Sequence, residues 1–150
     1  MEIKQLNKNN AIPYELLYLA DPSEEAVKDY LNRGVCYTGL INDEIIGVYV
    51  LLPTRPFTIE LVNLAVKDEF QGNGYGKELI RHAIEIAESH HYNTLEVGTG
   101  NAGISQLALY QKCGFRITSV DLDFFRKHYD EPIFENGIEC RDMIRLSMDL

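Results

Sequence analysis

A glycine-rich turn is the stretch of this sequence whose residue types are best suited to bind an anion. It reads Gln71-Gly72-Asn73-Gly74-Tyr75-Gly76-Lys77 and lies between a strand-like run, 58–66, and a helix-like run, 77–90. Glycine adopts positive φ readily and lets a ligand approach the bare backbone. Amides at the start of a helix point outwards, where the helix dipole favours negative charge. The turn therefore has the chemistry of a pyrophosphate-binding loop.

The spacing within this turn argues against two common nucleotide-binding motifs. The glycines follow the pattern G-x-G-x-G rather than the Rossmann pattern G-x-G-x-x-G. A Walker A loop requires Ser or Thr directly after the lysine, and Glu78 follows Lys77. Taken alone, the turn is also compatible with a plain tight connection between a strand and a helix. Other stretches have to decide between these interpretations.

Length, charge and cysteine usage limit the class of protein. A chain of 150 residues is the size of one domain, which we assign to residues 1–150. A net charge of −9 argues against binding to nucleic acid or to an anionic membrane surface. It is compatible with a cationic partner, or with solubility alone. The three cysteines and four histidines show no metal-ligand spacing, so no metal is expected, and the lack of a signal-peptide pattern favours the cytoplasm.

Hydrophobic periodicity predicts a mixed α/β domain with about four helices. Asn42-Asp43 has the residue types of a tight hairpin turn, and Asn136-Gly137 is a second turn signal before the last strand. A helix joins the strands at 58–66 and 94–97, so we expect this pair to be parallel. The predicted strands cover 3–6, 35–41, 44–52, 58–66, 94–97, 115–122 and part of 138–150, and the helices start near 13, 24, 77 and 104.

A second block, Leu109-Tyr110-Gln111-Lys112-Cys113-Gly114-Phe115, has the pattern of a helix that ends at a glycine cap. Together with Gln71-x-x-Gly74-x-Gly76 upstream, it resembles the signature of the GNAT (GCN5-related) N-acetyltransferase superfamily, small bacterial type. The resemblance covers nearly the whole chain except 121–139. It implies a mostly antiparallel sheet whose two central parallel strands splay apart, with acetyl-CoA in the gap between them.

The resemblance also implies which residues would hold acetyl-CoA. Backbone groups of Leu64 and Val66 would pair with the pantetheine arm, and an amide of Leu64 or Ala65 would stabilise the oxyanion. Amides of the turn would hold the pyrophosphate, from Gln71, Gly72, Asn73, Gly74, Tyr75, Gly76 and Lys77. Many members carry an asparagine seven residues before the tyrosine, where this chain has Gly103. Asn101 or Ser105 could replace it, or the contact could be absent, and Asn101 could equally cap a helix.

Acyl transfer to an amine needs a way to remove a proton, because an amine of pKa ~10.4 is neutral in only about one molecule per thousand near pH ~7.4. Glu60 is the candidate base. It resembles the glutamate of histone-acetylating members, and its place six residues before Val66 predicts the same strand face, roughly 20 Å along the strand. The alternatives are a solvent-facing or positioning role for Glu60, with Asn63 and Glu96 as weaker candidates for the base.

Tyr110 is the candidate acid. A phenol of pKa ~10 stays protonated at working pH and can donate towards the departing thiolate, whose thiol has a pKa of about 8.5. The alternative for Tyr110 is a buried structural tyrosine.

The acceptor pocket of the superfamily uses the first helices and the late connections of the sheet. On that basis we expect Tyr30, Asp123, Phe124, His128 and Tyr129 to contact the acceptor, through ion pairs and cation–π contacts. A solvated acidic loop is the alternative for the residues after 121.

The predicted function is transfer of the acetyl group of acetyl-CoA to a small cationic amine or peptide amine, directly within a ternary complex. The alternative is a non-catalytic acetyl-CoA-sensing module. A homodimer is possible on either interpretation.

Overall fold

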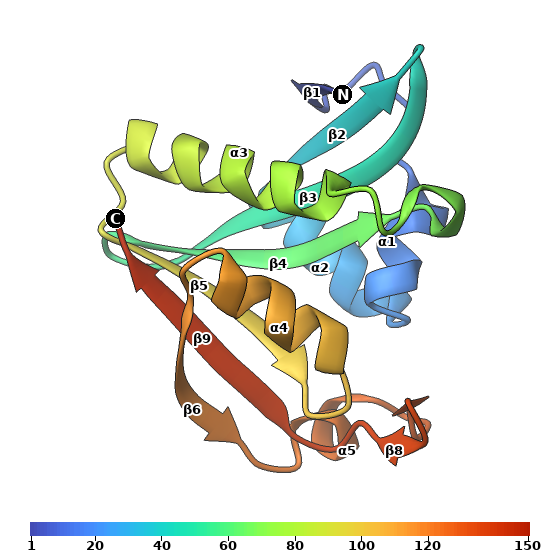
Figure 1. Ribbon diagram of the computed structural model, residues 1–150, viewed down its shortest axis with the longest axis vertical. Helices are drawn as coiled ribbons and strands as arrows, with labels where there is room; N and C mark the ends of the chain where they lie inside the picture. The colour runs from blue at the N-terminus through green and yellow to red at the C-terminus, as the bar shows by residue number, and fades with distance from the viewer.

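The computed structural model describes residues 1–150 and contains one seven-stranded sheet with helices on both faces (Figure 1). The strand order is β1-β2-β3-β4-β5-β9-β6, and β4–β5 is the parallel pair among antiparallel neighbours. The strands are β1 (Glu2–Gln5), β2 (Val35–Ile41), β3 (Glu44–Arg55), β4 (Thr58–Val66), β5 (Thr94–Gly100), β6 (Arg116–Asp121) and β9 (Met143–Asp149), with a separate hairpin of β7 (Phe134–Glu135) and β8 (Ile138–Glu139). The helices are α1 (Tyr14–Ala20), α2 (Glu24–Arg33), α3 (Tyr75–Ser89), α4 (Ile104–Lys112) and α5 (Phe124–His128), and a 3-10 turn covers Asp68–Phe70. The predicted fold class is confirmed, with α5 added to the four expected helices.

Local sequence signals set several of these boundaries. Asn42 and Asp43 have φ of 50° and 65°, as a two-residue hairpin turn between β2 and β3 requires. Asn136 and Gly137, with φ of 54° and 73°, form a similar turn, but it closes the small β7–β8 hairpin instead of leading into the last strand. The Ser23 side chain caps α2 by accepting a hydrogen bond from the Ala26 amide at 3.1 Å.

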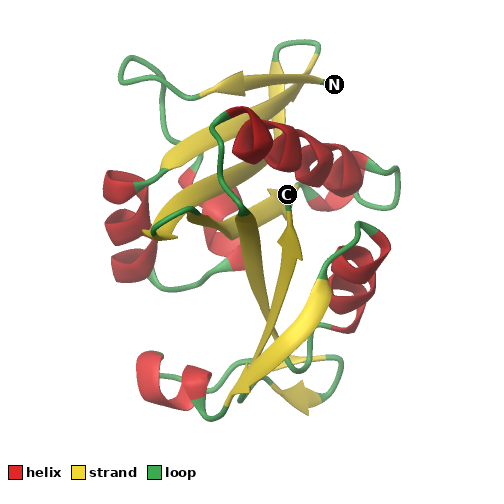
Figure 2. Cartoon of the chain, turned by 90° about the vertical axis from the view of Figure 1, so that its left-hand side faces the viewer, coloured by secondary structure: helices red, strands yellow, loops and turns green.

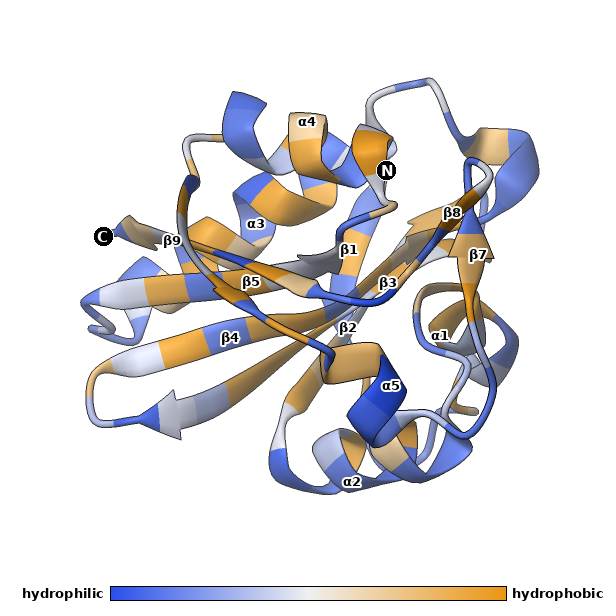
Figure 3. Cartoon of the chain, turned by 90° about the horizontal axis from the view of Figure 1, so that it is seen from below, coloured by the Kyte–Doolittle hydropathy of each residue, from blue (hydrophilic) through white to orange (hydrophobic).

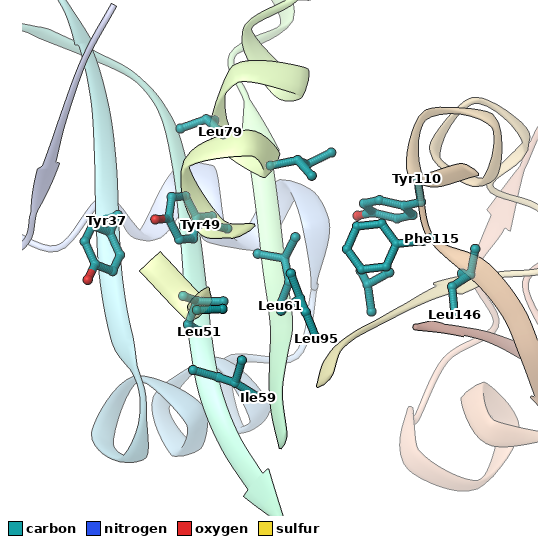
Figure 4. Close-up of a cluster of buried hydrophobic side chains, with 14 residues drawn as sticks. Tyr37, Tyr49, Leu51, Ile59, Leu61, Leu79, Leu95, Tyr110, Phe115 and Leu146 are labelled. Carbon is teal, nitrogen blue, oxygen red and sulfur yellow. The ribbon is translucent and has the colours of Figure 1, made fainter. Parts of the chain in front are cut away.

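Two hydrophobic clusters cover the two faces of the sheet. On one face, α3 buries Leu79, Ile80, Ala83 and Ala87 against the central strands in a cluster that also includes Tyr110 (Figure 4). On the other face, α1 and α2 pack against β3 and β4. Figure 3 shows α3 and α4 on one side of the sheet and α1, α2 and α5 on the other. None of the helices has the length and apolar run needed to cross a bilayer.

The central strands diverge at a defined point. The parallel pairing of β4 with β5 runs from Thr58↔Thr94 to Leu61↔Val97 and stops there, although both strands continue. In Figure 2 the strands fan out strongly, so that the half of the sheet with β5, β9 and β6 lies below the half with β1 to β4. Past Leu61, β4 therefore has an edge without a neighbouring strand.

A β-bulge in β4 sits where the pair diverges. Val50 of β3 lies opposite Asn63 and Leu51 lies opposite Leu61, so Val62 has no partner of its own. One extra residue reverses the alternation of side chains along a strand.

The bulge contradicts one expectation about the faces of β4. Glu60 lies opposite Leu52, which packs in the cluster under α1 and α2. Val66 lies opposite Gly47, on the face covered by Leu79 of α3. The expectation that Glu60 and Val66 share a face is therefore wrong, because it counted six residues of regular strand.

Candidate active site

A cavity of about 370 Å³ occupies the gap between the diverging strands. Its walls come from both faces of the sheet. β4 contributes residues 61–66, β5 contributes 98–100, α4 contributes Gln106 and Tyr110, and Gln71 lies at the glycine turn. The other face contributes residues 18–22 around the end of α1, together with Phe125, Tyr129, Ile133, Glu135, Cys140 and Met143. A ligand on the α3–α4 face and a ligand on the α1–α5 face can thus meet in one space.

The free edge of β4 presents backbone groups to this cavity. The Lys67 amide donates to the Ile46 carbonyl of β3 at 2.8 Å. Because hydrogen-bonding directions alternate along an antiparallel pair, the amides and carbonyls of Leu64 and Val66 point away from β3 and into the gap. By the same alternation, the backbone of Ala65 faces Val48 within the ladder. Leu64 and Val66 can therefore pair with an extended ligand as a further strand would, and Ala65 cannot.

The glycine turn is shaped by its own side chains. Gln71 Nε2 donates to the Val66 carbonyl at 3.0 Å, and Asn73 Nδ2 donates to the Phe70 carbonyl at 3.1 Å. Gly72 and Gly74 have φ of 79° and 85°, and a Cβ at either position would meet nothing within 4 Å. These two glycines are required by the backbone conformation rather than by crowding.

The same turn leaves a row of amides without acceptors. Gly74 is the N-cap of α3 and provides no side-chain cap. The first bond across this end of the helix runs from the Glu78 amide to the Gly74 carbonyl at 3.1 Å. The preceding amides of the first turn, from Tyr75, Gly76 and Lys77, have no intrahelical partner. They form the positive end of a 15-residue helix, which suits a phosphate group.

Tyr110 lies in the wall of the cavity. Its side chain is 7% exposed, and its ring packs edge-on against Phe115 with the ring centres 5.9 Å apart. Figure 4 shows the hydroxyl end of the ring directed towards β4. Burial raises the pKa of Tyr110, so the phenol keeps its proton at any working pH. The hydroxyl makes no hydrogen bond within the chain and is available as a donor to a ligand.

Glu60 lies just outside the cavity. It lies opposite Glu96, one residue before the end of the β4–β5 pairing. Its carboxylate lies 3.6 Å from Nη1 of Arg145. Burial raises the pKa of Glu60, and the charge of Arg145 opposes that shift. Among the weaker candidates for the base, Glu96 binds Arg55 at 3.0 Å, whereas Asn63 is buried and lines the cavity. The structure therefore brings Tyr110 and Asn63 together in the cavity, and Glu60 is not among the residues that line it.

Asn101 and Ser105 do not line the cavity. Asn101 Oδ1 accepts hydrogen bonds from the amides of Arg141 and Asp142, and its Nδ2 donates to the Glu139 carbonyl at 3.1 Å. Asn101 is also not a helix N-cap, because Gly103 holds that position in α4. The interpretation of Asn101 as a cap was wrong because its partners lie 38 to 41 residues away. Ser105 is exposed and donates to Gln106.

The residues predicted to contact an acceptor are only partly brought to the cavity. Tyr129 lines it directly, and Tyr30 lies behind it, buried against Asn63. Phe124 instead packs at a tilt against His128, with ring centres 4.6 Å apart. Asp123 pairs with Arg141, which lowers the pKa of that carboxyl.

Sequence reasoning missed several residues in the cavity wall, namely Asp21, Thr99 and Gln106. No local signal marks them, since their role depends on contacts between distant segments. The hydrogen bond from the Tyr129 hydroxyl to Asp21, for example, joins positions 108 residues apart.

The site combines three features: the free edge of β4, which can pair with an extended arm, the anion-binding glycine turn at one end of that edge, and the buried phenol of Tyr110 beside it. This combination is that of a cofactor-dependent group-transfer enzyme. The sequence model of the Acetyltransferase (GNAT) family matches residues 4–115, and the chain belongs to this family. The family predicted from the two sequence blocks is confirmed, and with it the class of enzyme, an acetyltransferase.

Relatives along the whole chain agree with this assignment. The uncharacterized N-acetyltransferase YvbK of Bacillus subtilis (strain 168) is 61% identical over 137 residues, which cover 91% of this chain and 88% of YvbK. The structure of an IAA acetyltransferase from Bacillus cereus ATCC 14579 has a TM-score of 0.96 and 57% identity, and 99% of each chain is covered. A GNAT family acetyltransferase from Elizabethkingia anophelis, solved with acetyl-CoA bound, has a TM-score of 0.98 and 48% identity over 99% of this chain and 97% of that chain.

Proposed function

We propose that this protein transfers the acetyl group of acetyl-CoA to a primary amine, with both substrates bound at once. Acetyl-CoA is the co-substrate, in keeping with the family and with the acetyl-CoA bound to the Elizabethkingia relative. The observation that carries the proposal is that one cavity joins the free edge of β4, the hydroxyl of Tyr110 and an acidic wall on the opposite face.

The donor occupies the α3–α4 face. The pantetheine arm pairs with the backbone of Leu64 and Val66, and the pyrophosphate binds the amides between Gln71 and Lys77. The side chains of Gln71 and Asn73 act indirectly, because their hydrogen bonds hold the turn in shape. Asn101 and Ser105 are left out of this assignment, because neither side chain reaches the cavity.

The reaction requires no covalent enzyme intermediate. The nitrogen of the neutral amine attacks the thioester carbon, a C–N bond forms, and the carbonyl oxygen becomes an oxyanion that the Leu64 amide stabilises. Collapse of this intermediate breaks the C–S bond. The nitrogen loses one proton and the thiolate gains one, with the Tyr110 hydroxyl as the donor beside the sulfur.

An ammonium group must first lose a proton, and Glu60 is the proposed acceptor of it. Because Glu60 is not among the residues that line the cavity, the proton passes through water rather than directly. The burial that raises the pKa of Glu60 brings the carboxylate closer to the pH range in which a base is useful.

Release of free coenzyme A, measured with a thiol reagent, tests the proposal. The panel of acceptors contains diamines and polyamines, aminoglycosides, amino acids and lysine peptides, and heat-inactivated protein is the control. We expect amine-dependent release with at least one class. A thermal shift with acetyl-CoA but not with ATP, and no release with any amine, would instead support a non-catalytic acetyl-CoA-sensing module and overturn the proposal.

A further inference from the structure

The charged groups in the cavity wall all carry the same sign. Of the 23 residues that line it, Asp21 and Glu135 are the ones with ionisable carboxylates, and none is Lys, Arg or His. Both carboxylates lie on the α1–α5 side, away from the glycine turn. Tyr18, Phe125 and Tyr129 add aromatic rings to the same wall. A substrate carboxylate would find no cation among the lining residues, whereas a cation would find carboxylates and ring faces there.

Asn63 provides a second, independent indication of what binds. Its side chain is 3% exposed, and it lines the cavity. Both amide hydrogens are used, one on the Leu17 carbonyl at 3.0 Å and one on the Tyr30 hydroxyl at 2.8 Å. These bonds fix the orientation of the amide and leave Oδ1 as the one buried side-chain oxygen or nitrogen without a partner. A buried acceptor in that state is costly unless a ligand supplies an N–H or O–H group.

Asp21 is held in place by the same network. Its carboxylate accepts hydrogen bonds from Tyr129 at 2.8 Å, from Tyr30 at 3.3 Å and from the Ser23 amide at 3.1 Å. Burial raises the pKa of both phenols, so both remain donors to the carboxylate. No Lys, Arg or His side chain pairs with Asp21, in contrast to Asp123, which pairs with Arg141. The negative charge of Asp21 is therefore fixed in position but not neutralised by any group of the chain.

We propose that the acceptor is an amine that carries a second cationic group and no carboxylate. Asn63 Oδ1 accepts an N–H of the amine, and Asp21 and Glu135 supply the negative charge that binds the dication. This inference rests on the proposed acetyltransferase function and names the substrate class of the same cavity. Asp21 and Asn63 are binding residues here, distinct from the group that donates to the thiolate.

Three amines of nearly equal length test the inference: cadaverine, hexylamine and δ-aminovalerate. They differ at the far end, which is cationic, apolar or anionic. In the coenzyme A release assay we expect kcat/KM to fall in that order, by at least about tenfold at each step, because each step removes an attraction or adds a repulsion in a buried site.

Two variants test whether Asp21 and Glu135 cause the preference for cadaverine. Asp21→Asn keeps the shape of the side chain. Its oxygen can still accept from Tyr129, and its amide can donate to the Tyr30 oxygen, so it should fold, and an unchanged Tm would verify that it does. It should raise the KM for cadaverine by about tenfold or more with a smaller change in kcat, and leave the KM for acetyl-CoA unchanged. Glu135→Gln, at an exposed position, should reduce the preference for cadaverine over hexylamine by a smaller factor, about twofold to fivefold. Glu15→Gln on the surface of α1 removes the same charge outside the cavity and serves as the matched control.

The outcomes distinguish an error in the substrate class from an error in the proposed acetyltransferase function. Acetylation of all three amines at similar kcat/KM, or a preference that Asp21→Asn does not alter, overturns the inference and leaves the acetyltransferase function standing. Failure to release coenzyme A with any amine of the larger panel, despite binding of acetyl-CoA, overturns the proposed function and the inference with it.

Discussion

Replacement of Tyr110 by phenylalanine isolates one hydroxyl in the proposed mechanism. The hydroxyl makes no hydrogen bond within the chain, and the ring that packs against Phe115 is retained, so the variant loses no contact of the folded state. We therefore expect the Tm of Tyr110→Phe to match that of the wild type or to lie slightly above it.

The effect on turnover follows from what the hydroxyl would stabilise. Loss of one preorganised donor to a developing negative charge in a buried site costs about 10²- to 10³-fold in kcat. The departing thiolate needs less help than an alkoxide would, because its thiol has a pKa of about 8.5. We expect a loss near the lower end of the range, about 10²-fold, with an unchanged KM for acetyl-CoA.

The assay is coenzyme A release at saturating amine, run from about pH 7 to about pH 9. Burial raises the pKa of Tyr110, so the wild-type phenol keeps its proton across this range. The ratio of wild-type kcat to Tyr110→Phe kcat should therefore be the same at every pH. Tyr37→Phe, a buried tyrosine of the same hydrophobic cluster outside the cavity, is the control and should be fully active. A Tyr110→Phe enzyme within about threefold of wild type would refute the assignment of this residue as the donor.

Three further substitutions probe the turn and the strand. Gly74→Ala should lower the free energy of unfolding by about 1–2 kcal/mol because φ is 85° there, whereas Gly76→Ala, at a helical position, should raise it slightly; urea denaturation measures both. Gly74→Ala should also weaken acetyl-CoA binding in a thermal-shift titration, and equal stability of the two variants would contradict the argument. Glu60→Gln should lower kcat and flatten the acidic limb of its pH profile. Because burial raises the folded pKa of Glu60, the wild type loses stability relative to this variant as pH rises through that pKa, and the two converge at acid pH; a Tm difference independent of pH would contradict the burial argument.

Much of the fold could be predicted because its signals are local. Asn42-Asp43 specifies a two-residue turn by residue type, and the stripe of α3 repeats with the period of a helix, so both are visible without knowledge of contacts. The proposed binding of the pyrophosphate and the pantetheine arm also rests on local signals. The backbone of the glycine turn and of the strand before it lies within one stretch of chain, which a motif can identify.

The rest of the site could not be predicted to the same extent, for two physical reasons. First, side chains alternate with a period of two, so the single extra residue at Val62 reversed the predicted face of Glu60. No residue type marks that bulge. Second, Asp21 and Asn101 make their decisive contacts with segments far away in sequence. Their side chains could serve as caps, ligands or ties, and only the folded chain selects among these uses.

Because the walls of the cavity come from opposite faces of the sheet, the proposed reaction has donor and acceptor approach the cavity by separate routes. If neither molecule covers the route of the other, as the proposal requires, an inert thioether analogue of acetyl-CoA should compete with the donor and leave binding of the amine intact. Double-reciprocal plots for such an enzyme intersect rather than run parallel, and no acetylated form of the protein accumulates between encounters. In the proposed reaction the unpaired stretch of β4 holds the donor beside the amine, so the polypeptide itself does not have to carry the acyl group.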